Sequence, residues 1–153
     1  MQLVVFCLDE QRYGLPLAMV ERIVRAAELT PLPQAPAIVM GVIDVDGQVL
    51  PVLNIRWRLR LPHREISPAD QFLIGQTGRR TVVLVIDEAQ GVIEVPDVDV
   101  VDAVEIVPGL DQIRGVVKLG DGLLLIHDLE RFLSLEEEHA LDQAMYEEIL
   151  HGA

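Results

Sequence analysis

The chain has 153 residues, half of them apolar, and a formal net charge of −13. That length and composition suffice for one compact core or two small ones and predict a soluble globular protein. The charge argues against partners that present phosphate backbones or anionic lipids, because both attract basic proteins, so no nucleic acid is expected as a partner. Apolar runs such as 81–86 are far shorter than the ~20 residues of a membrane-spanning helix, so no direct membrane insertion is expected.

The start of the chain favours a cytoplasmic location. Met1 and Gln2 run directly into an apolar segment, without the basic region and the cleavage site of a secretory signal. The cytoplasm is therefore the expected compartment.

Short apolar runs bounded by Gly, Pro and Asp dominate residues 2–127 and predict an all-β fold. Several runs, such as 82–86, are apolar on both faces, so their strands must be covered on both sides, as when two small barrels pack together. The predicted strands are 2–8, 41–45, 48–54, 71–76, 81–87, 91–95, 113–119 and 122–127.

A short helix or helical turn is predicted after Pro16. Leu17, Val20, Ile23 and Val24 recur at spacings of three and four residues, which is the period of one helical face. We expect this segment to feed an apolar seam.

Asp46-Gly47 predicts a two-residue hairpin turn between the apolar runs on either side of it. Glycine adopts the positive φ that such a turn requires. Pro51 predicts that the second strand of this hairpin is an edge strand or contains a bulge, because proline has no N–H to donate to a ladder.

The segment 55–61 alternates basic and apolar side chains. Arg56, Arg58 and Arg60 form a basic stripe if the segment is extended, and a short helix is the other interpretation. A solvated basic face is favoured for these arginines, while attraction to an acidic stripe on a partner stays open. Trp57 belongs either to the core or to an interface, where tryptophan is enriched.

An acidic amphipathic helix is predicted over 134–153. Ser134 and Glu137 have the spacing of a capping box, and an apolar stripe of Leu141, Ala144, Met145 and Ile149 follows. Residues 128–153 carry −7 of the net charge. Packing of the stripe against the barrels is favoured over a separate role in docking a partner.

Catalytic and metal-binding patterns are sparse. Ser67 lies in a loop and Ser134 fits a helix cap better than a nucleophile, while the four histidines lack metal-ligand spacing. Asp44 and Asp46 have the spacing of an acid–base pair on one strand face, but turn chemistry explains Asp46 better. The sequence therefore predicts no enzyme, no cofactor and no metal site.

Several motifs follow one another along the chain in a recognisable order. They are an opening strand with Tyr13-Gly14, a proline at Pro36, the hairpin Gly41-Val-Ile-Asp-Val-Asp-Gly-Gln-Val-Leu-Pro-Val-Leu-Asn-Ile-Arg56, and the segments 82–92 and 122–133. Together they resemble the motifs of the CheW family of chemotaxis coupling proteins, whose hairpin segment reads Gly-Val-x-Asn-Leu-Arg-Gly-x-x-Ile-Pro-Val-x-Asp-Leu-Arg. The resemblance covers residues 2–133.

The resemblance implies a CheW-like domain over 1–133 made of two intertwined, SH3-like five-stranded β-barrel subdomains, with the acidic helix following it. It also implies an adaptor without chemistry of its own that couples the cytoplasmic tips of methyl-accepting receptors to the regulatory domain of a CheA-type histidine kinase. Such an adaptor would lie in the cytoplasm, at receptor arrays beneath the inner membrane. The alternatives are a ligand-sensing β-barrel module and a kinase-binding decoy in a non-motility chemosensory pathway.

The resemblance also implies a partner-binding surface. Val20 and Gly41 keep the family's residue types, whereas Arg22 stands where the family has Glu and Asp46 where it has Arg. Because the two departures together reverse an ion pair and preserve its complementarity, we expect Arg22 and Asp46 to meet and to alter partner preference. An apolar groove for the receptor's helical tip is expected from Val20, Ile23, Val39 and Val42. The complete set of expected partner-binding residues is Val20, Arg22, Ile23, Val39, Gly41, Val42, Asp46 and Arg56.

Overall fold

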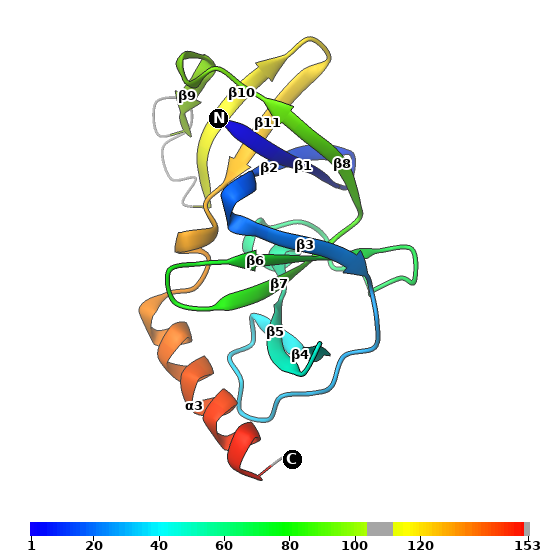
Figure 1. Ribbon diagram of the computed structural model, residues 1–153, viewed down its shortest axis with the longest axis vertical. Coiled ribbons are helices and arrows are strands. Elements are labelled where there is room, and N and C mark those ends of the chain that lie inside the picture. The colour runs from blue at the N-terminus through cyan, green and yellow to red at the C-terminus, as the bar shows by residue number, and fades with distance from the viewer. Residues whose placement is uncertain (104–111, 152–153) are drawn as a thin grey trace.

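The computed structural model describes residues 1–103 and 112–151 and shows two β-sheets, each curled into an SH3-like barrel, with one long helix at the C-terminal end (Figure 1). The predicted all-β fold is confirmed. In the described residues the first barrel has six strands rather than the expected five, because a short three-residue strand adds to its edge. Its strands are β1 (Gln2–Leu8), β2 (Gln11–Pro16), β8 (Glu88–Glu94), β9 (Val100–Asp102), β10 (Ile113–Leu119) and β11 (Gly122–His127).

The second barrel has the expected five strands and is built from the middle of the chain. Its strand order is β3-β6-β7-β5-β4, which leaves β3 and β4 as the two edges. Each barrel contains one parallel pair, β2 with β11 in the first and β5 with β7 in the second. The strands of the second barrel are β3 (Val20–Arg25), β4 (Val39–Val45), β5 (Gln48–Leu53), β6 (Gln71–Gln76) and β7 (Thr81–Ile86).

The helical turn that the sequence offered after Pro16 is present as a 3₁₀ turn, η1 (Leu17–Met19). A longer helix is wrong, because the chain continues as strand β3. β3 has a register shift between Val20 and Arg22, where it pairs with β6. The extra residue places Val20 and Ile23 against the same core although they are three residues apart. The β-bulge therefore gives two core-facing residues of β3 the three-residue spacing that is typical of a helical face.

The predicted hairpin turn is confirmed. Asp46 and Gly47 both have positive φ, at 53° and 86°, and join Val45 directly to its partner Gln48. Pro51 predicted an edge strand or a bulge for β5, and the edge assignment is wrong, because β5 lies between β4 and β7. The register shift of this hairpin is in the partner strand, between Val39 and Gly41 of β4. Pro51 is tolerated because its β4 partner Val42 directs its N–H and C=O toward Thr30, and pairing with β7 begins only at the next residue.

The largest hydrophobic cluster lies where the two barrels meet. Phe6 and Leu15 come from the first barrel, and Leu53 and Leu84 come from the second, all fully buried. Each barrel also has its own smaller cluster, and together these clusters explain why so many strands are apolar on both faces.

The C-terminal helix α3 (Leu135–His151) runs along the side of the second barrel (Figure 1). The predicted capping box is present: the Ser134 N–H donates to Glu137 Oε1 at 2.9 Å, and the Glu137 N–H donates to Ser134 Oγ at 3.1 Å. Leu141 and Ala144 are buried against Leu32 and Val42, so the packing role that the sequence favoured is confirmed. The side chain of Ile149 lies outside the described residues.

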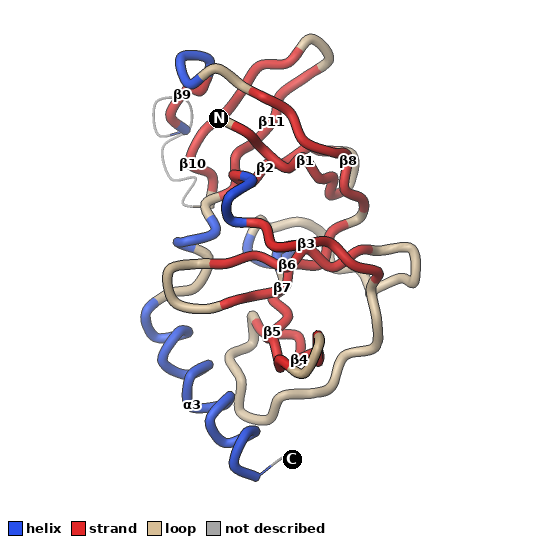
Figure 2. Tube along the Cα trace, viewed as in Figure 1, coloured by secondary structure: helices blue, strands red, loops and turns tan. Residues whose placement is uncertain are grey.

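A long connection without regular structure joins the two edge strands of the second barrel. It covers residues 26–38 and winds from the end of β3 past β4 and β5 toward α3 (Figure 2). Its backbone pairs with β4 through two hydrogen bonds between Thr30 and Val42, at 2.8 and 2.9 Å. We call residues 26–38 the strap.

Candidate partner-binding site

The two residues that reverse the family's charges meet in the structure, as expected. Arg22 Nη2 lies 2.6 Å from Asp46 Oδ2, and the side chains are 47 % and 81 % exposed. Arg22 comes from β3, whereas Asp46 comes from the turn between β4 and β5. The pair therefore bridges the two edge strands of the second barrel and faces solvent.

A groove of about 370 Å³ lies beside this ion pair, between β3, the strap and β4. Arg22 and Arg25 give it one basic wall, while Glu28 and Asp46 contribute acidic groups from the strap and the hairpin. Ile43, which packs against the interior cluster of the barrel, adds apolar surface. The groove thus offers both signs of charge beside an apolar contact.

The second aspartate of the hairpin serves the turn. Asp44 Oδ1 accepts a hydrogen bond from the Gly47 N–H at 2.8 Å. With Asp46 paired to Arg22, the two carboxylates that have acid–base spacing both have structural partners.

Gly41 is a packing position rather than an exposed contact. It is buried, and a Cβ at this residue would lie 2.7 Å from the Thr30 carbonyl oxygen and 3.2 Å from Leu29 Cβ. Only glycine lets the strap approach β4 this closely. A substitution here therefore displaces the strap from β4.

The apolar candidates do not line one open groove. Val20, Ile23 and Val39 are half-buried and pack against the large cluster between the barrels. Val42 is only 3 % exposed, because α3 and the strap cover it. Val42 is therefore out of reach of a partner while α3 stays in place.

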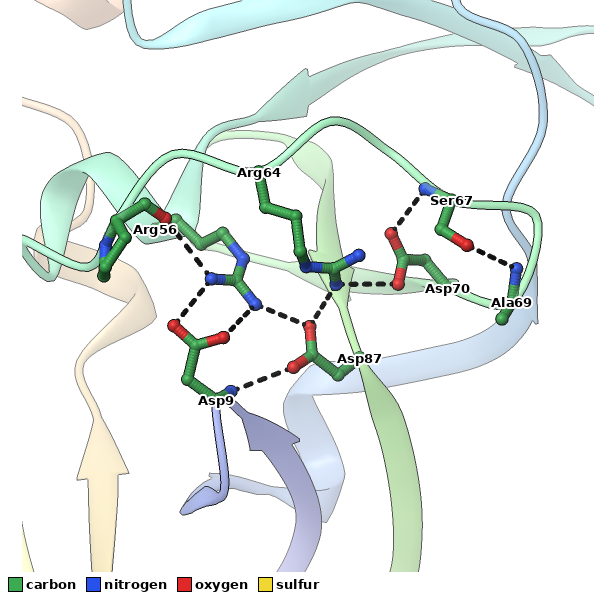
Figure 3. Close-up of polar contacts among 8 residues, drawn as sticks. Asp9, Arg56, Arg64, Ser67, Ala69, Asp70 and Asp87 are labelled. Carbon is green, nitrogen blue, oxygen red and sulfur yellow. Dashed lines mark hydrogen bonds and ion pairs between the residues drawn. The ribbon is translucent and has the colours of Figure 1, made fainter.

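Arg56 is buried at the centre of an ionic network that joins the two barrels (Figure 3). Its guanidinium donates to both carboxylate oxygens of Asp9 at 2.8 Å and to Asp87 at 2.8 Å. Arg64 adds a second bond to Asp87 and one to the buried Asp70, at 2.5 and 2.8 Å. Asp9 lies in the β1–β2 turn of the first barrel, so the network ties this turn to the second barrel.

The pKa values in the network follow these hydrogen bonds. The bond from Arg56 lowers the pKa of Asp9 despite partial desolvation. Burial acts to raise the pKa of Asp87, but hydrogen bonds from the Asp9 N–H, Arg56 and Arg64 lower it overall. Both carboxylates therefore stay ionised at neutral pH and hold the arginines in place.

The solvated basic face that the sequence favoured is wrong for two of its three arginines. Residues 55–58 form the short helix α1 (Ile55–Arg58), which Asn54 caps by accepting a hydrogen bond from the Trp57 N–H at 3.1 Å. Arg58 turns toward α3, donates to both oxygens of Glu137 at 2.6 Å and lies over the Phe132 ring. Trp57 is 53 % exposed, which agrees with the interface alternative more than with the core.

The structure brings together residues that sequence reasoning did not single out. Arg25 and Glu28 border the groove, and Asp9, Arg64 and Asp87 complete the network around Arg56. Asp87 directly follows a buried strand, which is the one sequence signal for a placed carboxylate here. The other residues have no periodicity or spacing that points to them.

In residues 1–103 and 112–151, no group of three His, Cys, Asp or Glu side chains is arranged to hold a metal ion. Within the same ranges, no helix has the length and apolar character needed to cross a membrane.

The fold and the groove define a class of protein: a double SH3-like barrel module whose second barrel carries an ion pair and a mixed-charge groove between its edge strands. The CheW-like domain model matches residues 2–137, and the chain belongs to this family. Most of α3 lies beyond the match.

Individual relatives agree with this assignment. A chemotaxis protein CheW of Treponema pallidum is 30 % identical over 142 residues, covering 89 % of this chain and 84 % of the relative. A chemotaxis protein CheW of Bacillus subtilis is 30 % identical over 150 residues, covering 94 % of each chain. The crystal structure of the scaffolding protein TtCheW from Thermoanaerobacter tengcongensis has a TM-score of 0.79 at 23 % identity, covers 89 % of each chain and supports the fold.

Proposed function

We propose that this protein is a chemosensory adaptor that couples methyl-accepting receptors to a CheA-type histidine kinase by binding alone. Membership of the CheW-like family and relatives named as chemotaxis proteins support this role. The protein would act in the cytoplasm, at receptor arrays beneath the inner membrane. Its regulatory effect would come from holding two partners together, without a chemical step.

The ion pair between Arg22 and Asp46 is the observation that assigns the proposed partner binding to a particular surface. Arg22 and Asp46 occupy positions where the family resemblance implies partner contact, and they keep a direct bond at 2.6 Å with the charges exchanged. An exposed ion pair contributes only about 0–1 kcal/mol to stability. Like charges brought together at an interface cost several kcal/mol, so this pair acts mainly on the choice of partner.

The remaining candidates divide by their accessibility. Arg22, Asp46 and the groove beside them form the exposed part of the proposed site. Gly41 acts by seating the strap, and Arg56 acts by fixing the two barrels to each other. Val20, Ile23 and Val39 are half-buried and pack against the cluster between the two barrels.

The test measures binding of the kinase regulatory domain and of receptor cytoplasmic tips, both from the same organism, to the unmodified protein and to three variants. Arg22→Glu and Asp46→Arg each place like charges side by side, so we expect each to weaken binding at least tenfold. The double variant R22E/D46R restores the ion pair with the family's polarity. We expect it to fold normally, to bind the cognate partner less tightly and to bind a partner of standard polarity more tightly.

The chain offers a matched control in the first barrel. Arg12 and Asp121 form another ion pair at the same 2.6 Å separation, with side chains 24 % and 78 % exposed, so R12E/D121R repeats the exchange away from the proposed site. This control should bind both partners as the unmodified protein does. Undiminished binding by both single variants would exclude the proposed surface, and binding of the kinase without the receptor would replace the adaptor by a decoy.

A further inference from the structure

We propose that α3 is an intramolecular competitor that occupies a docking site for an acidic amphipathic helix, the partner helix being supplied by the receptor's cytoplasmic tip. The inference rests on the proposed function and adds that α3 regulates binding of the receptor tip. The site is the face of the second barrel formed by Leu32, Val39 and Val42 with two flanking arginines, Arg58 and Arg80. We call it the α3 seat.

The apolar part of the seat is small and matches one face of a helix. Leu141 is fully buried and Ala144 is 3 % exposed, and both pack on Leu32 and Val42. These two helix residues are three apart, the spacing of neighbours on one helical face. The seat therefore accepts a helix that presents apolar residues at this spacing.

The charged part of the seat determines which helix fits. Arg58 donates to both oxygens of Glu137 at 2.6 Å. Arg80 donates through Nε to the buried Glu138 at 2.9 Å and also bonds Asp142. Two arginines of the barrels thus hold three carboxylates of α3, so an apolar helix without acidic residues would leave both guanidinium groups without these partners.

The balance of contacts makes α3 displaceable. Over the 13 positions from Leu135 to Glu147 whose side chains are described, only Leu141 and Ala144 are buried apolar residues. Met145 is partly buried beside them, whereas Leu135 and Tyr146 are 72 % and 62 % exposed. Arg80 and Glu138 form a mostly buried pair, so α3 leaves only when another helix supplies carboxylates to the same arginines. A partner helix with the same acidic pattern and more apolar anchors would replace α3.

The seat is also connected to the proposed partner site. The strap carries Leu32 and Ala35 to the seat and supplies Glu28 and Thr30 to the groove beside Arg22. Gly41 holds the strap against β4 between these two regions. Release of α3 therefore uncovers Val42 and frees one side of the strap, next to the groove.

The test compares the affinity of a receptor cytoplasmic-tip fragment for the full-length protein and for two variants that release α3. Leu141→Glu places a charge in the apolar seat, and Arg80→Glu removes the ionic contact without touching the core. Amide hydrogen exchange in α3 reports the release. We expect faster exchange in both variants and an affinity for the tip fragment about tenfold higher.

Two additions make the test specific. A synthetic peptide of residues 134–151, added to Leu141→Glu, should compete with the tip fragment and return its apparent affinity toward that of the unmodified protein. Tyr146→Ala, which alters an exposed residue of the same helix, should change neither exchange nor affinity. R80E/E138R, which restores opposite charges between the barrel and α3, should reverse part of the effect of R80E.

The outcomes separate this inference from the proposed function. Equal affinity of the tip fragment for the released variants and for the unmodified protein would overturn the competition by α3 and leave the adaptor role standing. Absence of tip binding by the unmodified protein and by every variant would overturn the adaptor role and the competition together.

Discussion

His127 is an ionisable side chain enclosed entirely by the protein. It is 0 % exposed, and the ring lies edge-on to Phe132. Among residues 1–103 and 112–151, neither ring nitrogen has a hydrogen-bond partner. Burial lowers its pKa to about 3. The folded protein therefore holds this histidine in the neutral form throughout the physiological range.

This burial predicts a loss of stability in mild acid. The unfolded chain binds a proton at His127 below its ordinary pKa of about 6.5, whereas the folded chain does not bind it until about pH 3. The free energy of unfolding should therefore be fully retained above pH 6.5 and fall by about 2 kcal/mol between pH 7 and pH 5. Urea unfolding at the two pH values measures this difference.

His127→Leu provides the control, because leucine cannot bind the proton. The free energy of unfolding of this variant should fall much less between pH 7 and pH 5 than that of the unmodified protein. This holds whatever its free energy of unfolding is at pH 7. The carboxylates Asp9 and Asp87 have lowered pKa values and titrate below this window. An unchanged pH dependence in the leucine variant would mean that His127 is not the group responsible.

Single residues show where sequence reasoning succeeds and where it stops. The contact between Arg22 and Asp46 was predictable because both residues stand at motif positions that the family resemblance brings together. The contacts of Arg56 were not predictable, since Asp9 and Asp87 lie 47 and 31 residues away and no spacing connects them. A side chain that is buried by residues far away in the chain leaves no pattern in the sequence around it.

At the scale of single elements, α3 depends on its first turn. The capping box satisfies N–H groups that a helix start otherwise leaves without partners. Ser134→Ala should therefore reduce the free energy of unfolding by about 1 kcal/mol and increase amide exchange in the first turn of α3. Denaturant unfolding and hydrogen exchange measure the two effects.

Ser134→Asp tests the same cap with a different acceptor. Aspartate is a good N-cap residue, so this variant should unfold close to the unmodified protein. If alanine and aspartate at this position gave equal stability and exchange, the cap would contribute nothing to α3.

The elements that the sequence predicted best are those with a local cause. The hairpin turn at Asp46-Gly47 and the start of α3 are set by residues within three positions of each other. β3 was mistaken for a helix because its bulge is fixed by pairing with β6, some fifty residues later in the chain. β9 is a three-residue strand at a sheet edge, too short for a recognisable alternation.

At the scale of the whole molecule, the network around Arg56 joins the barrels. Arg56→Met removes one partner of a buried ionic cluster and leaves Asp9 and Asp87 facing each other. We expect the free energy of unfolding to fall by about 3 kcal/mol. Urea unfolding measures the change.

Arg22→Met is the matched comparison, because Arg22 also donates to a carboxylate at short distance but is exposed. Its free energy of unfolding should stay within about 1 kcal/mol of that of the unmodified protein. Similar losses in the two variants would contradict the structural role assigned to Arg56.

The fold class was predictable at this scale because apolar strands on both faces demand two covering layers, and the family resemblance supplied the barrel architecture. The parallel strand pair in each barrel could not be predicted from the sequence pattern. Side chains point alternately to the two faces of the sheet in parallel and antiparallel strands alike. The order of strands likewise depends on contacts between distant segments.

The path of the chain between the barrels has a consequence for how the protein folds. All strands of the second barrel lie between Val20 and Ile86, a continuous stretch, whereas the first barrel must bring Gln2 opposite Glu94 and Arg12 opposite Leu124. Closing such long loops costs chain entropy before any pairing is gained. Formation of the second barrel shortens these loops, because β3 and β7 both pair with β6 and the start and end of the stretch then belong to one sheet. We therefore expect the second barrel to fold first and the first barrel to close last.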